Sequence, residues 1–303
     1  MDNILILIVT YNGAKTIETV LTSCLSDAFL KETSLLVIDN GSVDATVDLV
    51  QSFTETNVSI LALSENLGVA TAYNLGIKEA QKRGLQWLFV LDQDSVCVTD
   101  CLSHLYQQAQ QLQKQVSKLA GVFPCVRSEQ FPDCIHYPYQ WTETHFVPAP
   151  ESVSEEKVLV KVDSSLSSGS LYVVEALADI GGFREDYFID FVEHECHLRL
   201  VQQGWHFYWD RQAVLYHNLG AHQQMMAEGL WIEHAPFRYY YMSRNMLEGL
   251  TRLGGQSARQ RFLKQDLFEY WKRSFKHGKQ PLKSSFFMLR GLLDAFLGRF
   301  GRL

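Results

Sequence analysis

Two aspartates one position apart, Asp92 and Asp94, are the residues of this chain best suited to chemistry. With Gln93 between them, they follow directly on the apolar run Trp87–Leu91, which predicts a buried strand. Two carboxylates at a strand end can hold a hard divalent cation and leave positions open for ligand oxygens. A nucleoside diphosphate supplies such oxygens, and the cation neutralises the charge that grows on a leaving diphosphate. The alternative is a turn with solvated acids.

A second group of acids comes at the expected start of a helix after Phe188. Asp190 comes first, and Glu193 and Glu195 lie near the helix start, where the helix dipole favours negative charge. A carboxylate here could take a proton from a hydroxyl group within hydrogen-bond reach. The alternative is a charged amphipathic helix that faces water.

Two further residues carry weaker signals. Asp39 opens the turn Asp39–Asp44 and could accept hydrogen bonds from a base N–H or a ribose hydroxyl. His217 follows a strand-like run, where a histidine is most often structural, although an imidazole also suits a divalent metal.

Four apolar runs, each followed by a turn and a helical pattern, must position these residues. The runs are Ile4–Val9, Leu35–Ile38, Val58–Leu63 and Trp87–Leu91. Repeated β-then-α units predict a mainly parallel sheet covered by helices on both faces. Ligands gather at the carboxyl ends of the strands of such sheets. The polar residues expected along that rim are Thr10–Asn12, Asp39, Asn66 and Asp92–Asp94.

The rest of the chain is less regular. Residues 121–165 are rich in aromatic residues and proline, which predicts long loops over the sheet. Strand-like segments are expected at Ser164–Val174 and Phe207–His217, with a loop and helix between them. After Glu233 the sequence becomes helical and basic.

Composition and charge are those of a folded protein with an unusual tail. The 303 residues are 47% hydrophobic and 20% charged, enough for one large domain with an appendage. The net charge is −7, but residues 252–303 hold 12 Lys and Arg against 3 Asp and Glu, which leaves −16 on residues 1–251. This asymmetry predicts an anionic contact for the tail, either a membrane surface or a partner. No nucleic-acid motif accompanies the basic residues, so no nucleic-acid partner is expected.

Cysteine usage and the N-terminus predict that the protein is cytoplasmic or lies at the cytosolic face of the inner membrane. The six cysteines form no CxxC pair, and free thiols in a reducing compartment are expected. The first apolar run is too short for a signal peptide, and no stretch approaches the roughly 18 apolar residues of a membrane-spanning helix.

Taken together, the motifs resemble family 2 glycosyltransferases, whose fold is called GT-A. The ordered set spans residues 4 to about 220 and consists of Ile8–Asn12, Val37–Ser42, Asn66–Gly68 with Asn74 and Gly76, and Leu91–Asp94. Each motif is common alone, whereas the ordered combination is specific. Asp92-Gln93-Asp94 followed by Ser95 resembles more particularly the branch that uses dTDP-rhamnose.

The resemblance implies an α/β fold: a GT-A nucleotide-diphospho-sugar transferase core with a mainly parallel central sheet, helices on both faces and a C-terminal helical extension. Residues 1–235 would form the catalytic domain, with the nucleotide-sugar half at 1–100 and the acceptor half at 101–235. Residues 236–303 would form a basic, amphipathic helical region.

The resemblance also implies roles for individual residues. Asp94 would ligate a divalent metal, Mg²⁺ or Mn²⁺, with His217 and Asp92 completing the metal site. Glu193, counted from Leu198-Arg199, falls on the position of the catalytic base, with Glu195 as a second acid. The family more often has Asp at that position, which keeps Asp190 as the alternative base. The residues implied to bind the nucleotide sugar are Thr10, Tyr11, Asn12, Asp39, Asn66, Gly68, Asn74, Asp92 and Gln93.

On the acceptor side, the resemblance points to Gly169 and to Arg238, Arg244 and Asn245. An arginine there could bind a phosphate of a lipid-linked acceptor through two parallel hydrogen bonds. The alternatives are a simple Ser/Gly turn at Gly169 and an aromatic core helix with solvated arginines.

The function implied is inverting, metal-dependent transfer of a sugar onto a glycan or a lipid-diphosphate-linked glycan, in bacterial surface polysaccharide assembly such as that of O-antigen. The donor expected first is dTDP-rhamnose; UDP-hexose or UDP-N-acetylhexosamine is the alternative, and a non-catalytic nucleotide-sugar binder is a distant one. A nucleotide-dependent oxidoreductase is disfavoured because Thr10–Lys15 offers no glycine-rich phosphate loop after the first strand.

The C-terminal region alternates apolar and aromatic residues with Lys and Arg between Leu267 and Leu297. Such a pattern fits helices that lie in a membrane interface as a peripheral contact. A homo-oligomer contact, or helices packed on the main domain, would produce the same pattern.

Overall fold

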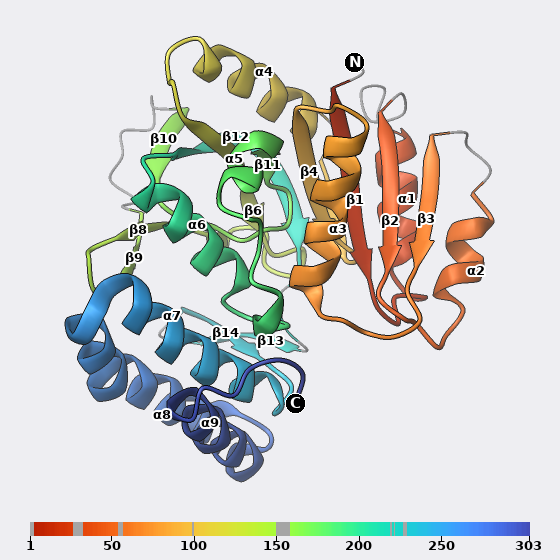
Figure 1. The fold of residues 1–303 in the computed structure, drawn as a ribbon. Coiled ribbons are helices and arrows are strands. Elements are labelled where there is room, and N and C mark those ends of the chain that lie inside the picture. Colours follow the sequence, from red (N-terminus) through yellow and green to blue (C-terminus); the bar gives the residue numbers. More distant parts are fainter. Residues whose placement is uncertain are drawn as a thin grey trace.

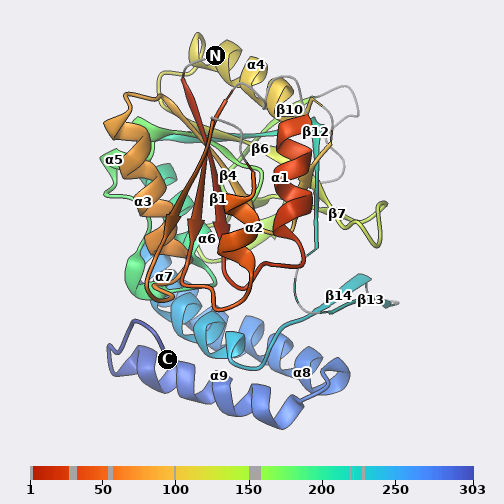
Figure 2. The same ribbon diagram turned by 90° about the vertical axis from the view of Figure 1, so that its right-hand side faces the viewer.

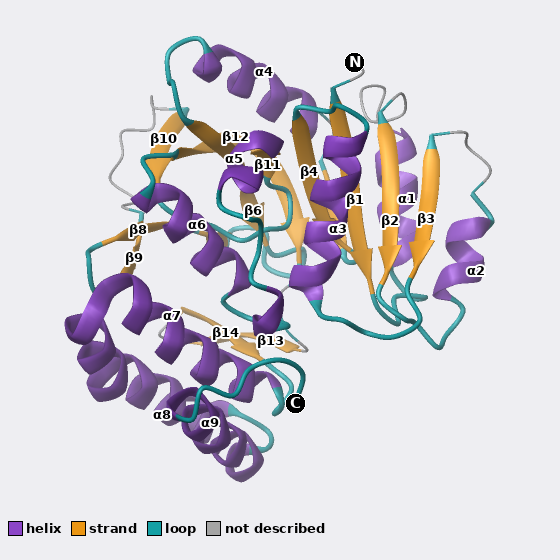
Figure 3. Ribbon diagram, viewed as in Figure 1, coloured by secondary structure: helices purple, strands orange, loops and turns teal. Residues whose placement is uncertain are grey.

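A mixed β-sheet flanked by helices forms the centre of the molecule, and a group of helices follows it at the C-terminus (Figures 1 and 3). The structure is a computed structural model. The residues that it describes are 3–26, 33–53, 57–98, 100–149, 158–218, 220, 222–226 and 229–303.

The central sheet has ten strands, most of which run parallel. From one edge to the other the order is β10 (Leu159–Val162), β12 (His206–His217), β6 (Leu119–Arg127), β11 (Leu171–Val173), β4 (Trp87–Asp92), β1 (Ile4–Thr10), β2 (Ser34–Asp39) and β3 (Val58–Ala62). Off this path, β5 (Ser95–Cys97) pairs with β12, and β7 (Ile135–His136) pairs with β6. β11 is antiparallel to both of its neighbours, and β10 is antiparallel to β12. The predicted mainly parallel sheet is confirmed.

Helices cover both faces of this sheet, as predicted. They are α1 (Ile17–Ser26), α2 (Thr46–Gln51), α3 (Val69–Lys82), α4 (Cys101–Gln113), α5 (Val174–Asp179) and α6 (Val192–Gln202). Figure 2 shows α3, α5 and α6 on one face and α1 on the other. Every residue of β1 is buried, which explains its unbroken apolar sequence. Gly76 lets α3 approach β1, because a Cβ there would lie 2.3 Å from the Leu7 side chain.

The prediction of long loops from residue 121 was wrong for β6, a nine-residue strand in the middle of the sheet. Pro124 is the reason that the strand pattern is hidden, since proline cannot donate a ladder hydrogen bond. The structure accommodates Pro124 at a register shift, where Phe123 pairs with Trp209 and Cys125 pairs with Val214.

The carboxyl ends of four strands meet at one edge of the sheet. β4, β6 and β12 run in the same direction, because β11 opposes both β4 and β6, and β12 is parallel to β6. β1 and β2 are parallel to β4. The last residues of β1, β2, β4 and β12 are Thr10, Asp39, Asp92 and His217, so these polar residues share the edge that the sequence predicted.

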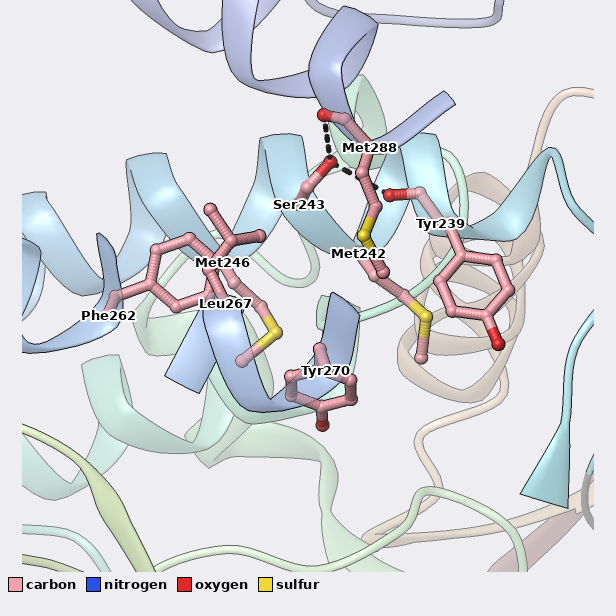
Figure 4. Close-up of a pocket in the computed structure, with 8 residues that line it drawn as sticks. All are labelled: Tyr239, Met242, Ser243, Met246, Phe262, Leu267, Tyr270 and Met288. Atoms are coloured by element: carbon pink, nitrogen blue, oxygen red, sulfur yellow. Dashed lines mark hydrogen bonds between the residues drawn. The ribbon is translucent and has the colours of Figure 1, made fainter. Parts of the chain in front are cut away.

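The C-terminal region is helical, as predicted after Glu233. It consists of α7 (Arg238–Arg261), a π-helical turn (Phe262–Asp266), α8 (Leu267–His277) and α9 (Pro281–Phe296). These helices form a layer on the side of the molecule toward which the carboxyl ends of β1 and β4 point (Figure 2). A small, mostly apolar cleft between them is lined by Tyr239, Met242, Ser243, Met246, Phe262, Leu267, Tyr270 and Met288 (Figure 4). No helix in the described part of the chain is long and apolar enough to span a membrane.

Two small hairpins and one short turn complete the described structure. The hairpins are β8 (Tyr139–Trp141) with β9 (Phe146–Pro148), and β13 (His222–Met226) with β14 (Gly229–Glu233). A 3-10 turn at Glu185–Tyr187 leads toward α6.

Candidate active site

Asp92, Asp94 and His217 converge at the carboxyl edge of the sheet. Asp92 ends β4, Asp94 lies in the turn to β5, and β5 pairs with the end of β12 so that Ser95 stands opposite His217. His217 Nδ1 lies 3.3 Å from Asp94 Oδ1, and His217 Nε2 lies 3.7 Å from Asp92 Oδ2. One potential ligand atom from each of the three side chains lies within 4.8 Å of the others.

Neutral hydroxyl groups hold this cluster in place. The Ser95 hydroxyl is 2.9 Å from His217 Nδ1 and 2.6 Å from Ser168 Oγ, and the Tyr73 hydroxyl donates to Asp92 Oδ1 at 3.2 Å. Tyr73, on α3, was missed by sequence reasoning. Its only sequence signal is its place beside Asn74, since a tyrosine on an apolar helix face is typical of a core residue.

The three groups perturb one another electrostatically. Burial raises the pKa of Asp92, and the charge of Asp94 acts in the same direction, against the lowering effect of His217. Burial disfavours the charged form of His217, but the hydrogen bond to Asp94 and the charge of Asp92 outweigh burial and raise the pKa of the imidazole. The carboxylates of Asp92 and Asp94 therefore both interact with the one buried imidazole of His217.

Glu193 lies in the first turn of α6 and is half-buried. Burial raises the pKa of its carboxyl group from 4.5 to about 7, and the charges of Asp190 and Asp92 act in the same direction. A carboxyl group with a pKa near neutrality is well matched to accepting a proton from a hydroxyl group.

Asp190 is engaged by Arg238, the first residue of α7. The guanidinium Nε donates to Asp190 Oδ1 at 3.2 Å and to Oδ2 at 3.1 Å, and Nη2 makes a closer bond to Oδ1. The guanidinium thus occupies both oxygens of the Asp190 carboxylate, so they are already engaged by a charged partner. This pairing favours Glu193 over Asp190 as the base.

Gln93 connects the end of β1 to the cluster of Asp92, Asp94 and His217. Its side-chain oxygen accepts from Thr10 Oγ1 at 2.9 Å and from the Tyr11 amide at 2.7 Å. Asn12, with φ of 50°, accepts from the Val43 amide at 3.0 Å. Tyr11 is 42% exposed at this rim and presents a ring to solvent.

Asp39 lies at the same rim but is buried. Its carboxylate accepts from the Ser42 amide at 2.9 Å and also from the Ser42 hydroxyl. Contact with a nucleotide base would therefore need this Ser42 turn to move.

The loop before α3 touches the loop before α6. The Gly68 amide donates to Asn66 Oδ1 at 2.9 Å, and the Val69 amide donates to the Phe188 carbonyl at 2.8 Å. Gly68 has φ of 87°, and a Cβ there would lie 2.6 Å from the Phe188 oxygen. Only glycine fits this contact.

Comparisons with known proteins bear on the family and the fold of this chain. Residues 5–149 match the sequence model of the family described as Glycosyl transferase family 2. The chain carries a family 2 glycosyltransferase domain. It also resembles the dTDP-rhamnosyl transferase RfbF of Shigella flexneri, at 26% identity over 248 residues, which are 80% of this chain and 78% of RfbF.

Solved glycosyltransferases share the fold. S. aureus TarS 1-349 in complex with UDP-GlcNAc matches with a TM-score of 0.59 and 16% identity, over 97% of this chain and 80% of that one. GalNAc-T7 with UDP, GalNAc and Mn²⁺ matches with a TM-score of 0.58 and 13% identity, over 91% of this chain and 58% of that one. The GT-A fold implied by the resemblance is confirmed. The division at residue 235 stays a prediction.

The ligand atoms of Asp92, Asp94 and His217 fit a divalent metal. Two carboxylates and one imidazole are ligands that both Mg²⁺ and Mn²⁺ accept. The side chains of Asp92 and Asp94 are 32% and 37% exposed, so the cluster opens toward solvent, where ligand oxygens would complete the coordination.

Glu195, implied to be a second acid of the site, is directed elsewhere. It is completely buried, its carboxylate accepts two bonds from Arg199 at 2.8 and 2.9 Å, and it also pairs with Arg252. Two positions along α6 turn the side chain about 200° away from Glu193. Glu195 therefore neutralises arginines inside the protein.

Arg244 and Asn245 do not line an acceptor site, contrary to the sequence-based expectation. Both are completely buried. Arg244 donates to the carbonyls of Gly301 at 2.7 Å and Tyr187 at 3.0 Å. Asn245 Nδ2 donates to three carbonyls in the loop before α6, those of Tyr187, Ile189 and Asp190, at 2.8 to 3.1 Å. Both residues hold backbone in place.

Asn74 and Gly169 are also engaged internally. Asn74 accepts from the Phe183 amide at 2.8 Å and donates to Glu185 at 2.9 Å, so it anchors the loop before α6 and does not face a donor. Gly169 is buried, and a Cβ there would lie 2.6 Å from Leu215 and 2.7 Å from Pro124. Close packing thus requires glycine at this position, and the acceptor role expected for Gly169 stays a prediction.

Proposed function

We propose that the chain is an inverting, metal-dependent glycosyltransferase that moves a sugar from a nucleoside diphosphate onto an acceptor hydroxyl. The observation that carries this proposal is the arrangement at the sheet edge. A cluster of Asp92, Asp94 and His217 lies near a carboxyl group, Glu193, whose pKa is raised to about 7 and whose charge interacts with Asp92. The family 2 domain and the fold support it.

Each of these residues would have its own role in an in-line displacement at the anomeric carbon. Glu193 takes the proton from the acceptor hydroxyl as that oxygen attacks the anomeric carbon. Asp92, Asp94 and His217 would hold a divalent cation, which when bound would neutralise charge on the leaving diphosphate. Tyr11, exposed at the rim, is placed to contact the nucleoside, and Arg238 engages Asp190 in the loop before the base.

The donor proposed is dTDP-rhamnose, transferred to a glycan or a lipid-diphosphate-linked glycan of a bacterial surface polysaccharide. Support comes from RfbF, which is 26% identical and aligns over 80% of this chain. The alternative donors are UDP-hexoses and UDP-N-acetylhexosamines, in line with the UDP-GlcNAc bound by TarS.

The test of this proposal measures turnover with a panel of nucleotide-sugar donors. Release of nucleoside diphosphate is followed with dTDP-rhamnose, UDP-glucose, UDP-galactose and UDP-N-acetylglucosamine, each with Mn²⁺ and with excess chelator. We expect release beyond one equivalent per protein from dTDP-rhamnose, and its loss in chelator. Preference for a UDP-sugar would overturn the donor assignment, and release that never exceeds one equivalent from any donor would make the protein a binder.

A further inference from the structure

Helix α9 presents a continuous apolar stripe to solvent. Its members recur every three or four positions, so they share one helix face. They are Leu282, Phe286, Leu289, Leu293, Phe296 and Leu297, each between 52% and 76% exposed. The opposite face packs on α7, where the Ser243 hydroxyl donates to the Met288 carbonyl at 3.0 Å and the Tyr240 hydroxyl donates to Asp294 at 2.9 Å. The stripe therefore points away from α7.

Helix α8 continues this surface. Phe268, Trp271 and Phe275 are 53%, 40% and 48% exposed, and their rings contact one another along the helix. Trp271 Nε1 donates to Ser285 Oγ at 2.9 Å, and Ser285 borders the α9 stripe next to Phe286. The two stripes are therefore adjacent, and together they form what we call the C-terminal apolar face.

Basic residues border the C-terminal apolar face. Residues 262–303 hold 9 Lys and Arg against 3 Asp and Glu, a net charge of +6. The exposed ones on and between α8 and α9 are Lys272, Arg273, Lys276, Lys279, Lys283 and Arg290. Lys283 and Arg290 lie about 80–100° around α9 from Leu282, beside the stripe.

We propose that the C-terminal apolar face docks the protein on an anionic lipid surface. An amphipathic helix with large apolar residues on one side and Lys or Arg beside them is stabilised at the boundary between acyl chains and headgroups. Anionic headgroups attract the basic border. A second copy of the chain would instead bring two positive faces together, because a twofold interface pairs each surface with itself. The charge thus favours lipid over a dimer.

Docking on lipid would place the candidate active site close to the membrane. Helix α7 carries α9 on one side, and its first residue, Arg238, reaches Asp190 in the site. The C-terminal helices form the layer on the side toward which the carboxyl ends of β1 and β4 point (Figure 2). An acceptor held in the membrane would therefore approach the candidate active site from the side of the C-terminal helices. The docking itself does not depend on sugar transfer.

The test is co-flotation of the full chain with vesicles of phosphatidylcholine alone or mixed with phosphatidylglycerol. We expect binding to the mixed vesicles, weakened by high salt. Leu289→Glu with Leu293→Glu should lower the partition coefficient at least about tenfold, because each leucine loses its apolar transfer. Lys272→Glu with Lys283→Glu should lower binding to mixed vesicles by about tenfold. Leu61→Glu, at an apolar position on β3 that is 41% exposed, is the matched control and should bind like wild type.

Three results would overturn the docking proposal. The wild-type protein could float with neither kind of vesicle, or the Leu289→Glu, Leu293→Glu variant could bind vesicles like wild type. Light scattering could instead show a wild-type dimer that this variant converts to monomer, which would identify a self-interface. Thermal unfolding checks that each variant is folded, and since the substituted side chains are exposed, unchanged melting is expected.

Discussion

At the scale of the residue, the choice of base depends on two carboxyl groups with different surroundings. Asp190 is held by a bidentate arginine, whereas Glu193 is half-buried and shows no side-chain donor to its carboxylate among the described residues. The same edge thus pairs one acid with an arginine and gives the other, Glu193, a pKa near neutrality. Glu193 lies in the first turn of α6, whereas Asp190 lies in the loop before that helix.

Substituting Glu193 by Gln should remove the base and leave binding intact. We expect kcat to fall by about 10²- to 10⁴-fold, the usual contribution of general base catalysis, with an unchanged donor Kd. Steady-state release of nucleoside diphosphate and calorimetric donor titration measure the two quantities. Glu175→Gln, at an exposed position on α5, is the control. Wild-type turnover in the Glu193 variant would transfer the role to Asp190.

The same substitution should stabilise the protein at high pH. Because the folded-state pKa of Glu193 is raised from 4.5 to about 7, ionisation opposes folding increasingly as pH rises through that window. We expect Glu193→Gln to increase the free energy of unfolding at pH 8.5 by about 2 kcal/mol, since one pKa unit is about 1.4 kcal/mol and solvent screens part of it. At pH 4.5 the two proteins should be equal. Urea unfolding in chelator at both values tests this, and a gain of equal size at both would contradict it.

At the scale of the element, one loop decides the geometry of the site. Residues 183–191 carry three positive φ angles, at Phe188, Asp190 and Phe191, a conformation that side chains rarely adopt. Asn74 anchors its beginning and Asn245 its end. The sequence motifs identified both asparagines as important, but a motif does not tell in which direction a side chain points.

Asn245→Ala should loosen this loop. Three buried carbonyls would lose their donor, so we expect a loss of about 2–4 kcal/mol in the free energy of unfolding. Turnover should fall with little change in donor Kd, because Glu193 follows the loop. Gln202→Ala removes one exposed side-chain bond to the Leu253 carbonyl and should cost under about 0.5 kcal/mol. Equal effects of the two substitutions on stability would refute the anchoring role.

Gly68→Ala compared with Gly84→Ala isolates the contact between the two loops. Both glycines have positive φ, 87° and 68°, so both substitutions strain the backbone by about 1–2 kcal/mol. Only at Gly68 would the new Cβ meet the Phe188 carbonyl, at 2.6 Å, whereas Gly84 has open space. We expect Gly68→Ala to weaken both donor binding and turnover and Gly84→Ala to affect neither. Unchanged kinetics in both variants would show that the loops act independently.

At the scale of the whole molecule, the sequence predicted the sheet and its functional edge but not the molecule's interior. Period and turns identified β1 to β4, because each is an apolar run, buried in β1, β2 and β4 and partly exposed in the edge strand β3. β6 was hidden by Pro124, which is tolerated only through a register shift with β12. The burial of Arg244 could not be foreseen, because it depends on the C-terminal tail folding back so that the Gly301 carbonyl meets the guanidinium.

His217 illustrates what distant contacts add. It lies more than a hundred positions from Asp92 in the chain, and only the parallel pairing of β12 with β6 and the short strand β5 bring the two together. The carboxylate pair was visible in the sequence as a local motif, whereas its imidazole partner rested on the family resemblance alone.

The most direct measurement is calorimetric titration of dTDP and UDP into the protein, with Mn²⁺ and with chelator, for wild type and Asp94→Asn. The proposal predicts that Mn²⁺ tightens nucleoside diphosphate binding to the wild type by at least about tenfold, since a cation held by Asp92, Asp94 and His217 would attract the diphosphate oxygens. It also predicts that Asp94→Asn loses this gain while unfolding at the wild-type temperature. Equal affinity with and without Mn²⁺ in the wild type would contradict a metal-dependent nucleotide site at this edge of the sheet.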